Sequence, residues 1–269
     1  MVEIFDNIRK IYLFSTPCEE LAEYVEFYSE SSAAATLAYA GNERFTVKMF
    51  PSWTPTFWIN LGTSYQLTLG KERALIPPGK DILITRDTTT ERHNLAGDYI
   101  FSLKFYPGGL ETVLGLDQSK LTRKVIDLAD LLPAALLSRI RLAKDFEERV
   151  KLFENFLLSQ MKAKMHRTNY TELVTKTIAT YSNGNMQYNL DELSERLFVT
   201  SKTITRYFNK VIGITPKSYL SILRSRAALT AFIADRNSFI PSDFGYYDMS
   251  HFYKEAIRFT GERMVANIS

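Results

Sequence analysis

Residues 189–213 read NLDELSERLFVTSKTITRYFNKVIG, a stretch that predicts two short helices joined by a tight turn. Asn189 followed three residues later by Glu192 forms a capping-box pattern, so a helix begins there. Thr200 is suited to cap a second helix, and Gly213 is suited to end it. Two helices of this length with so short a connection are typical of a helix-turn-helix unit.

The second of these helices has an apolar stripe. Ile204, Phe208 and Val211 recur at helical spacing and are expected to face the core. Side chains that donate hydrogen bonds or are small and polar are left on the rest of its surface, and such groups read base edges and phosphates in the major groove of DNA. We predict this set as DNA-binding: Lys202, Thr203, Thr205, Arg206 and Lys210.

A long helix follows the first unit. Thr215 and Pro216 supply a cap and a first-turn proline, and apolar positions continue to about Asp235. A helix of roughly 19 residues over about 216–235 would be about 28 Å long at 1.5 Å per residue. Successive major-groove faces lie about 34 Å apart, so this helix could hold two DNA-contacting helices in adjacent major grooves.

A second unit is predicted from Phe239 to Phe259. Asp248 caps a helix that reads MSHFYKEAIRF, with Phe252 and Phe259 facing inward. The outward-facing set, which we also predict as DNA-binding, is Met249, Ser250, Tyr253 and Lys254.

Residues 168–262 resemble the DNA-binding region of the AraC/XylS family of bacterial regulators. The resemblance implies a sequence-specific transcription regulator that binds double-stranded DNA, with Lys202, Thr203, Thr205 and Arg206 as the groove-facing set of the first unit. It also implies RNA polymerase and a second copy of the chain as further partners. The positions that carry the pattern are Leu190, Leu193, Ser194, Val199, Thr200, Ile204, Arg206, Phe208, Gly213, Thr215, Pro216, Tyr219, Leu220, Arg224, Ala228, Ile240, Gly245, Tyr246, Asp248, Ser250 and Phe252.

The second unit departs from the family pattern. Pro241 stands near the start of its first helix, where the family has Ala, so that helix must be short or shifted. Ala256 replaces a core aromatic residue, and 261–264 lack the closing Gly-x-Ser-Pro. The first unit is therefore expected to be the stronger reader. An alternative is that the second unit makes the module a protein-interaction platform.

The N-terminal half is predicted to be an antiparallel β sandwich or barrel, cupin-like, with flanking helices. Strands are expected at TLAYAG, RFTVKMF, TFWINLG, SYQLTLG, RALIPPG, DILITRD and YIFSLKF within residues 34–106. We expect helices at 17–31 and over a long run from 133 to about 165. The fold class is α+β, with domains at 1–165 and 168–269, the second being all-α.

Residues 105–110 and the DLADLL stretch resemble the N-terminal domain that precedes AraC-type modules in many regulators. This implies small-molecule sensing, dimerisation, or both. Trp53, Trp58, Tyr65 and Tyr99, together with Phe57, could line an effector pocket, although the same residues fit an ordinary sheet core.

No enzyme chemistry is predicted for this half. Glu91 and His93 are two apart in a predicted loop, and three histidines in the chain, with His166 and His251 elsewhere, form no metal-ligand cluster. We expect no metal and no cofactor. A cupin-like enzyme with a regulatory C-terminal part is the alternative.

The charge balance differs between the two parts of the chain. From Arg167 onward the chain has 13 Lys and Arg and 9 Asp and Glu, a net charge of +4. Residues 1–166 have 20 Lys and Arg and 21 Asp and Glu, a net charge of −1. A positive excess fits a phosphate-contacting surface. The single cysteine, Cys18, excludes an internal disulfide and suits the cytoplasm. No stretch has the pattern of a signal peptide or a membrane span, so no membrane partner is expected.

Overall fold

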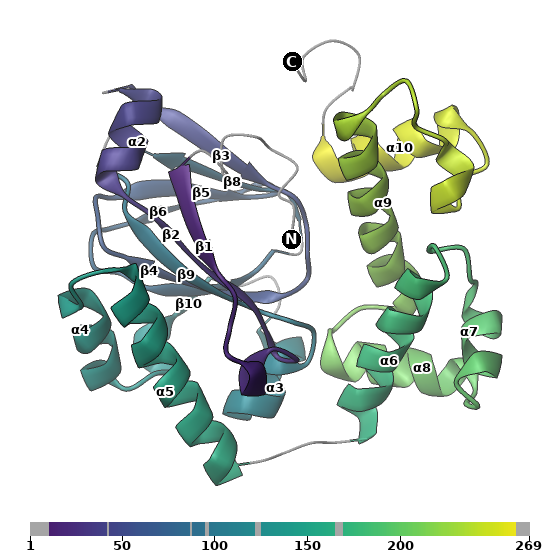
Figure 1. The fold of residues 1–269 in the computed structure, drawn as a ribbon, viewed down its shortest axis with the longest axis horizontal. Helices are drawn as coiled ribbons and strands as arrows, with labels where there is room; N and C mark the ends of the chain where they lie inside the picture. Colours follow the sequence, from purple (N-terminus) through teal and green to yellow (C-terminus); the bar gives the residue numbers. More distant parts are fainter. Residues whose placement is uncertain are drawn as a thin grey trace.

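The computed structural model describes residues 11–41, 43–86, 88–94, 97–121, 125–164 and 169–261. Two sheets and the helices that cover them form one half of the molecule, and the helices from α6 onward form the other, as Figure 1 shows on its left and right sides. The α+β class and the all-α C-terminal part agree with the prediction from sequence.

The larger sheet has six strands in the order β1-β2-β9-β4-β7-β10, all antiparallel to their neighbours. Strands β4 and β9 are buried along their whole length, because helices cover one face of this sheet and the second sheet covers the other. The strands are β1 (Tyr12–Ser15), β2 (Val25–Ser31), β4 (Pro55–Asn60), β7 (Ile82–Thr85), β9 (Ile100–Phe105) and β10 (Ile126–Asp127).

The smaller sheet has four strands in the order β3-β8-β5-β6 and packs face to face on the larger one. Its inward residues, among them Val47 and Leu67, meet Trp58, Ile82 and Ile84 of the larger sheet in one apolar cluster. This is the β sandwich that the sequence predicts. The strands are β3 (Phe45–Met49), β5 (Tyr65–Leu69), β6 (Glu72–Ile76) and β8 (Thr90–Asn94).

Helices cover the outer face of the six-stranded sheet. Phe101 of β9 stacks on Phe153 of α5 at 5.7 Å between ring centroids. Gly109 begins α3 where a Cβ would lie 2.1 Å from the carbonyl oxygen of Tyr24, so only glycine fits this approach. The elements of this layer are α3 (Gly109–Leu114), η2 (Gln118–Lys120), η3 (Leu128–Asp130), α4 (Ala134–Leu142) and α5 (Phe146–Lys164); η1 (Glu19–Leu21) packs against α5.

The C-terminal half consists of helices around one apolar cluster that contains Phe208, Leu229 and Phe252. The long helix α9 runs between the two helix-turn-helix units (Figure 1). The elements are α6 (Asn169–Asn183), α7 (Leu190–Arg196), α8 (Ser201–Val211), α9 (Pro216–Ala234), η4 (Pro241–Phe244) and α10 (Met249–Thr260).

The prediction of a helix over 17–31 is wrong. The segment forms η1 and then β2, which pairs with β9 through a register shift between Val25 and Phe27. Because the irregularity inserts one residue, Val25 and Tyr28 both face the core three positions apart, which imitates helical spacing.

Two further predictions of secondary structure are corrected. The expected strand at 36–41 belongs to helix α2 (Ala33–Ala40), which Ser32 caps by accepting from the Ala35 amide at 3.0 Å. The expected single helix from 133 to 165 is two helices. Ala143 leaves helical geometry at ψ 137°, and the Asp145 carboxylate accepts from the Glu148 amide to start α5 anew.

The two halves contact each other through buried groups. Gln118 donates from Nε2 to the carbonyl oxygens of Trp53 at 2.7 Å and Ile212 at 3.4 Å, so one amide joins the sheet half to the end of α8. The ring of Phe50 lies 5.7 Å from that of Phe259 in α10. No helix among the described residues is long and apolar enough to span a membrane.

Candidate nucleic-acid interface

The first helix-turn-helix unit forms as the sequence predicts. Asn189 and Glu192 make both bonds of a capping box at the start of α7. The Thr200 hydroxyl accepts from the Thr203 amide at 3.2 Å and starts α8. Ile204 and Phe208 are fully buried, so the stripe that they form fixes which face of α8 is turned outward.

The predicted reading residues of α8 fall into two groups. Lys202 and Arg206 are exposed one turn apart on the outward face, and Thr205 lies half-buried between them. Thr203 is instead part of the cap, since its hydroxyl lies 3.0 Å from that of Thr200. Lys210 is exposed but turns toward α6, with its Nζ 3.8 Å from the ring centroid of Tyr170.

Sequence reasoning missed Asn209, which is exposed one turn after Thr205 and Arg206. Its amide can both donate and accept, which suits it to adenine edges. Helical spacing from Arg206 was the available signal. The outward face of α8 therefore consists of Lys202, Thr205, Arg206 and Asn209.

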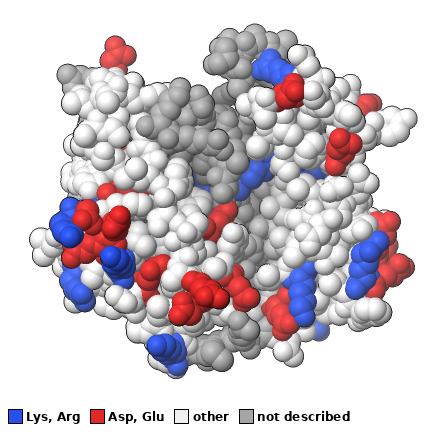
Figure 2. Space-filling model, viewed as in Figure 1, with Lys and Arg blue, Asp and Glu red and all other residues white. Residues whose placement is uncertain are grey.

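The chain from the cap of α8 to the end of α9 carries cations and no carboxylates, whereas the preceding helix α7 is acidic. Residues 200–234 contain no Asp or Glu, and their cations are Lys202, Arg206, Lys210, Lys217, Arg224 and Arg226. Elsewhere the charges are mixed: on the face drawn in Figure 2, both signs are interspersed over α4 and α5 and over α7. An acid-free stretch that includes α8 favours a polyanion as the partner of this helix.

Helix α9 begins with the predicted cap, Thr215 accepting from the Ser218 amide, and with Pro216 in its first turn. Its 19 residues make about 28 Å of helix. Tyr219, Leu229 and Phe232 are buried along it and place both units on one core. The separation of α8 and α10 is thus set by a rigid element.

The second unit is smaller than the first. Pro241 opens a single 3-10 turn, η4, as the expectation of a short first helix required. Asp248 caps α10 by accepting from the His251 amide at 2.7 Å. Ser250 and Lys254 are exposed, whereas Met249 and Tyr253 are half-buried and pack on the core, Tyr253 edge-on to Phe232.

An ion pair that the sequence did not reveal fixes α10 to α9. Arg224 donates from Nε and Nη2 to Glu255 Oε2 at 3.2 and 2.8 Å. Burial lowers the pKa of Arg224, but the Glu255 carboxylate outweighs this effect and holds that pKa above its usual value. The pair lies beside Ala256, the position where the family pattern has an aromatic residue.

The four residues predicted to line an effector pocket do not share one site. Trp58 and Tyr65 meet edge-on between the sheets, with their ring centroids 6.3 Å apart. Trp53 packs in the cluster of the C-terminal helices. Tyr99 donates to Glu30 on the face toward α5, where Arg149 covers its ring.

A buried cation occupies the space next to Trp58 and Tyr65. Arg92 lies 5.5 Å from both rings and forms an ion pair of 3.0 Å with Asp98. It also donates to the Tyr12 hydroxyl. The adjoining cavity beside Trp58 measures about 40 Å³, room for a water molecule, so an effector would enter here only if the sheets moved apart.

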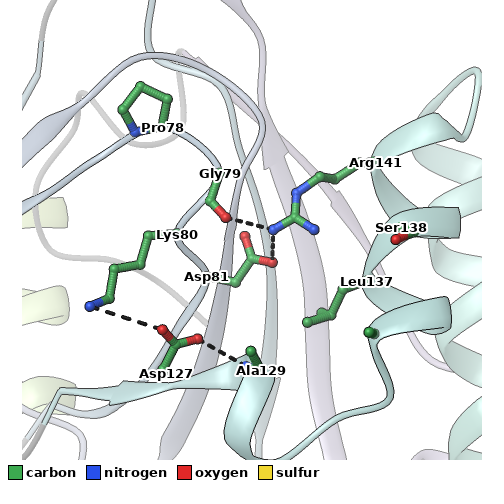
Figure 3. A pocket seen from close by; sticks show the side chains of 10 residues that line it. Pro78, Gly79, Lys80, Asp81, Asp127, Ala129, Leu137, Ser138 and Arg141 are labelled. Atoms are coloured by element: carbon green, nitrogen blue, oxygen red, sulfur yellow. Dashed lines mark hydrogen bonds and ion pairs between the residues drawn. The ribbon is translucent and has the colours of Figure 1, made fainter.

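A larger cavity of about 410 Å³ lies at the other end of the six-stranded sheet (Figure 3). Arg141 of α4 donates to the carbonyl oxygen of Gly79 and to the carboxylate of Asp81. The Nζ of Lys80 lies 4.0 Å from Oδ2 of Asp127. Burial raises the pKa of Asp81 to about 6, although Arg141 lowers it. The cavity has the volume of a small-molecule site.

The loop predicted at Glu91 and His93 is strand β8, so that prediction is wrong. The two side chains point to one face, with His93 Nε2 3.8 Å from Glu91 Oε2, and His93 Nδ1 bonds the Thr46 hydroxyl. Within the described residues no group of three or more His, Cys, Asp or Glu could hold a metal ion. His166 lies outside the described residues.

A comparison with solved structures finds three kinds of similar chain. ToxT from Vibrio cholerae matches with TM-score 0.48 and 10% identity over 82% of this chain and 95% of ToxT. The AraC-like transcriptional activator CuxR matches with TM-score 0.29 and 12% identity over 88% and 92%. The cupin domain of an XRE family regulator from Enterobacter cloacae matches with TM-score 0.28 and 12% identity over 36% and 96%.

ToxT has also been solved with an unsaturated fatty acid bound. No family model and no curated protein matches the sequence.

Proposed function

We propose that this protein is a transcription regulator that binds double-stranded DNA in a sequence-specific manner through α8. One observation carries the proposal: a capped helix turns Lys202, Thr205, Arg206 and Asn209 to solvent inside a stretch without carboxylates. Arg206 would pair with guanine through two parallel hydrogen bonds, and Asn209 would pair with adenine.

The second unit would support this contact from the adjacent groove. Ser250 and Lys254 are exposed on α10, while Met249 and Tyr253 serve its packing. A hydroxyl and a lysine favour phosphate contacts over base discrimination. The first unit would thus recognise the base sequence of its part of the site, and the second unit would mainly add affinity.

The experiment is selection of a binding site by the full chain from random duplex DNA. Arg206→Ala should weaken binding to the selected site by about 1–3 kcal/mol and relax the base preference at one position. Arg73→Ala is the matched control, because it removes an exposed arginine from β6 in the other half. Failure to select a motif, or equal effects of both variants, would contradict the proposal.

The proposal includes control of DNA binding by a small molecule. The molecule would bind a domain at 1–165, and the DNA would bind a domain at 168–269. The cavity between β7, β10 and α4 supports it, since about 410 Å³ accommodates a small ligand. Association with a second copy of the chain and contact with RNA polymerase are further parts of the proposal. Ligand-dependent change in DNA affinity of the full chain would test the first part.

A further inference from the structure

Each helix-turn-helix unit carries one aromatic side chain that is almost entirely exposed, just before its outward-facing helix. Phe198 is 96% exposed and lies two residues ahead of the cap of α8. Tyr247 is 93% exposed and directly precedes the cap of α10. The apolar core gains almost nothing from either ring.

The backbone at Phe198 is one that glycine ordinarily supplies. The amides of Phe198 and Val199 donate to the carbonyl oxygens of Glu195 at 3.2 Å and Ser194 at 3.0 Å, which is the pattern of a Schellman turn. Phe198 therefore adopts a positive φ of 55°, in the left-handed region that Cβ disfavours. The second unit has Gly245 at this point of the turn, with φ 70°.

The backbone of the first unit is thus strained at a residue whose side chain does not contribute to the core. A strained residue with no internal contact to justify it points to a role outside the molecule. The position is close to the start of α8 in the chain, because only Val199 separates Phe198 from the cap at Thr200. The acid-free stretch begins at that cap, so the chain that follows the ring is complementary to a polyanion, while the exposed carboxylate of Glu195 lies three residues before it.

We propose that Phe198 and Tyr247 pack on the sugar–phosphate backbone of the duplex where the two helices enter their grooves. This rests on the proposed function. The Phe198 ring would cover apolar deoxyribose edges, and Tyr247 would add a hydrogen bond from its hydroxyl to a phosphate oxygen. Both contacts fix the depth and angle of the helices and carry no base preference.

A ring on deoxyribose leaves a distinctive salt dependence. Phosphate neutralisation by lysine or arginine releases counterions, and log K then falls with log salt in proportion to the number of such contacts. An uncharged ring releases none. Loss of the ring should therefore lower affinity at every salt concentration by the same factor.

The test compares full-length variants on the selected site and on random duplex DNA across a salt series. Phe198→Asn removes the ring and keeps a residue that tolerates positive φ. We expect about three- to tenfold weaker binding to both DNAs, with the salt slope unchanged. Tyr247→Ala should act in the same way. Phe198→Tyr, which keeps the ring, should retain affinity.

Leu142→Ala is the matched control, since it truncates an 84% exposed apolar side chain on α4 of the other half. Urea unfolding should show Phe198→Asn at least as stable as the starting protein, so weaker binding cannot be ascribed to misfolding.

Unchanged DNA affinity of Phe198→Asn and Tyr247→Ala overturns the proposal. Unchanged affinity with lost transcription would assign the rings to a protein partner, and unchanged affinity with lost self-association would assign them to a second copy. If the starting protein selects no site, the proposed function has failed instead. The two failures are therefore distinguishable.

Discussion

At the scale of single residues, Asp81 carries the clearest pH dependence. Its carboxylate is buried at the cavity wall, and burial raises its pKa from 3.8 to about 6 even though Arg141 opposes this shift. A carboxyl whose pKa is higher in the folded state stabilises the fold below pH 3.8, and this contribution is lost as the pH rises through 6.

We expect Asp81→Asn to remove this dependence. A shift of about two units in the pKa of Asp81 corresponds to a fall of roughly 3 kcal/mol in the free energy of unfolding between pH 4 and pH 7. This figure is an upper bound, because Arg141 remains partly exposed. Urea unfolding at pH 4.5, 5.5 and 7 measures it. Asp127→Asn is the comparison, since this carboxylate is 39% exposed at the same cavity and the new asparagine can still accept from the Ala129 amide. It should reduce the slope only slightly, because the charge of Asp127 is the smallest of the causes that shift the pKa of Asp81. Equal slopes for Asp81→Asn and the starting protein would refute the expectation.

The Arg224–Glu255 pair gives a second prediction at this scale. Glu255→Gln should lower the free energy of unfolding by about 1–3 kcal/mol, because Arg224 would lose its charged partner in a mostly buried place. The double variant Arg224→Met with Glu255→Leu should recover part of that loss. Urea titrations of the starting protein and of these two variants measure the effect, and a double variant less stable than Glu255→Gln would oppose this interpretation.

At the scale of elements, the C-terminal helices were predictable because their signals are local. A cap at Asn189, Thr200, Thr215 or Asp248 and a stripe at three- to four-residue spacing are complete within about ten residues of sequence. The segment at 17–31 failed for a non-local reason. Its spacing comes from an irregular pairing with β9, more than seventy residues away in the chain.

The same reasoning concerns Ala256, where the family pattern would favour an aromatic residue. Here Ala256 is fully buried in the core cluster, with Phe252 and Phe259 on the same face of α10. Ala256→Phe should therefore destabilise the fold by about 1–3 kcal/mol through overpacking. Thermal unfolding measures this, with exposed Ile257→Phe as the control on the same helix. A rise in stability would mean that the core has room for the family residue.

At the scale of the whole molecule, the sequence predicted two parts but not how they touch. Phe50 and Trp53 read as sheet residues, yet they belong to the core cluster of the C-terminal helices. Gln118 reads as an ordinary polar residue of a loop, yet it is fully buried between the halves. Such contacts join segments about 65 and 94 positions apart, and no periodic pattern records them. The cavity at Asp81 was missed for the same reason, because the loop before β7 builds it together with β10, η3 and α4.

Gln118 should couple the two halves in solution, because it bonds to both. Gln118→Leu keeps the volume but leaves the carbonyl oxygens of Trp53 and Ile212 without their donor. Unsatisfied buried acceptors cost about 1–3 kcal/mol each, so amide exchange at the end of α8 and in α9 should accelerate roughly ten- to a hundredfold. Strands β4 and β9 should keep their protection, because their hydrogen bonds lie within the sandwich.

The control is Gln66→Leu, which replaces an exposed glutamine on β5. Faster exchange throughout the chain would mean that Gln118 stabilises the fold as a whole, and no change at all would mean that the halves part freely in solution.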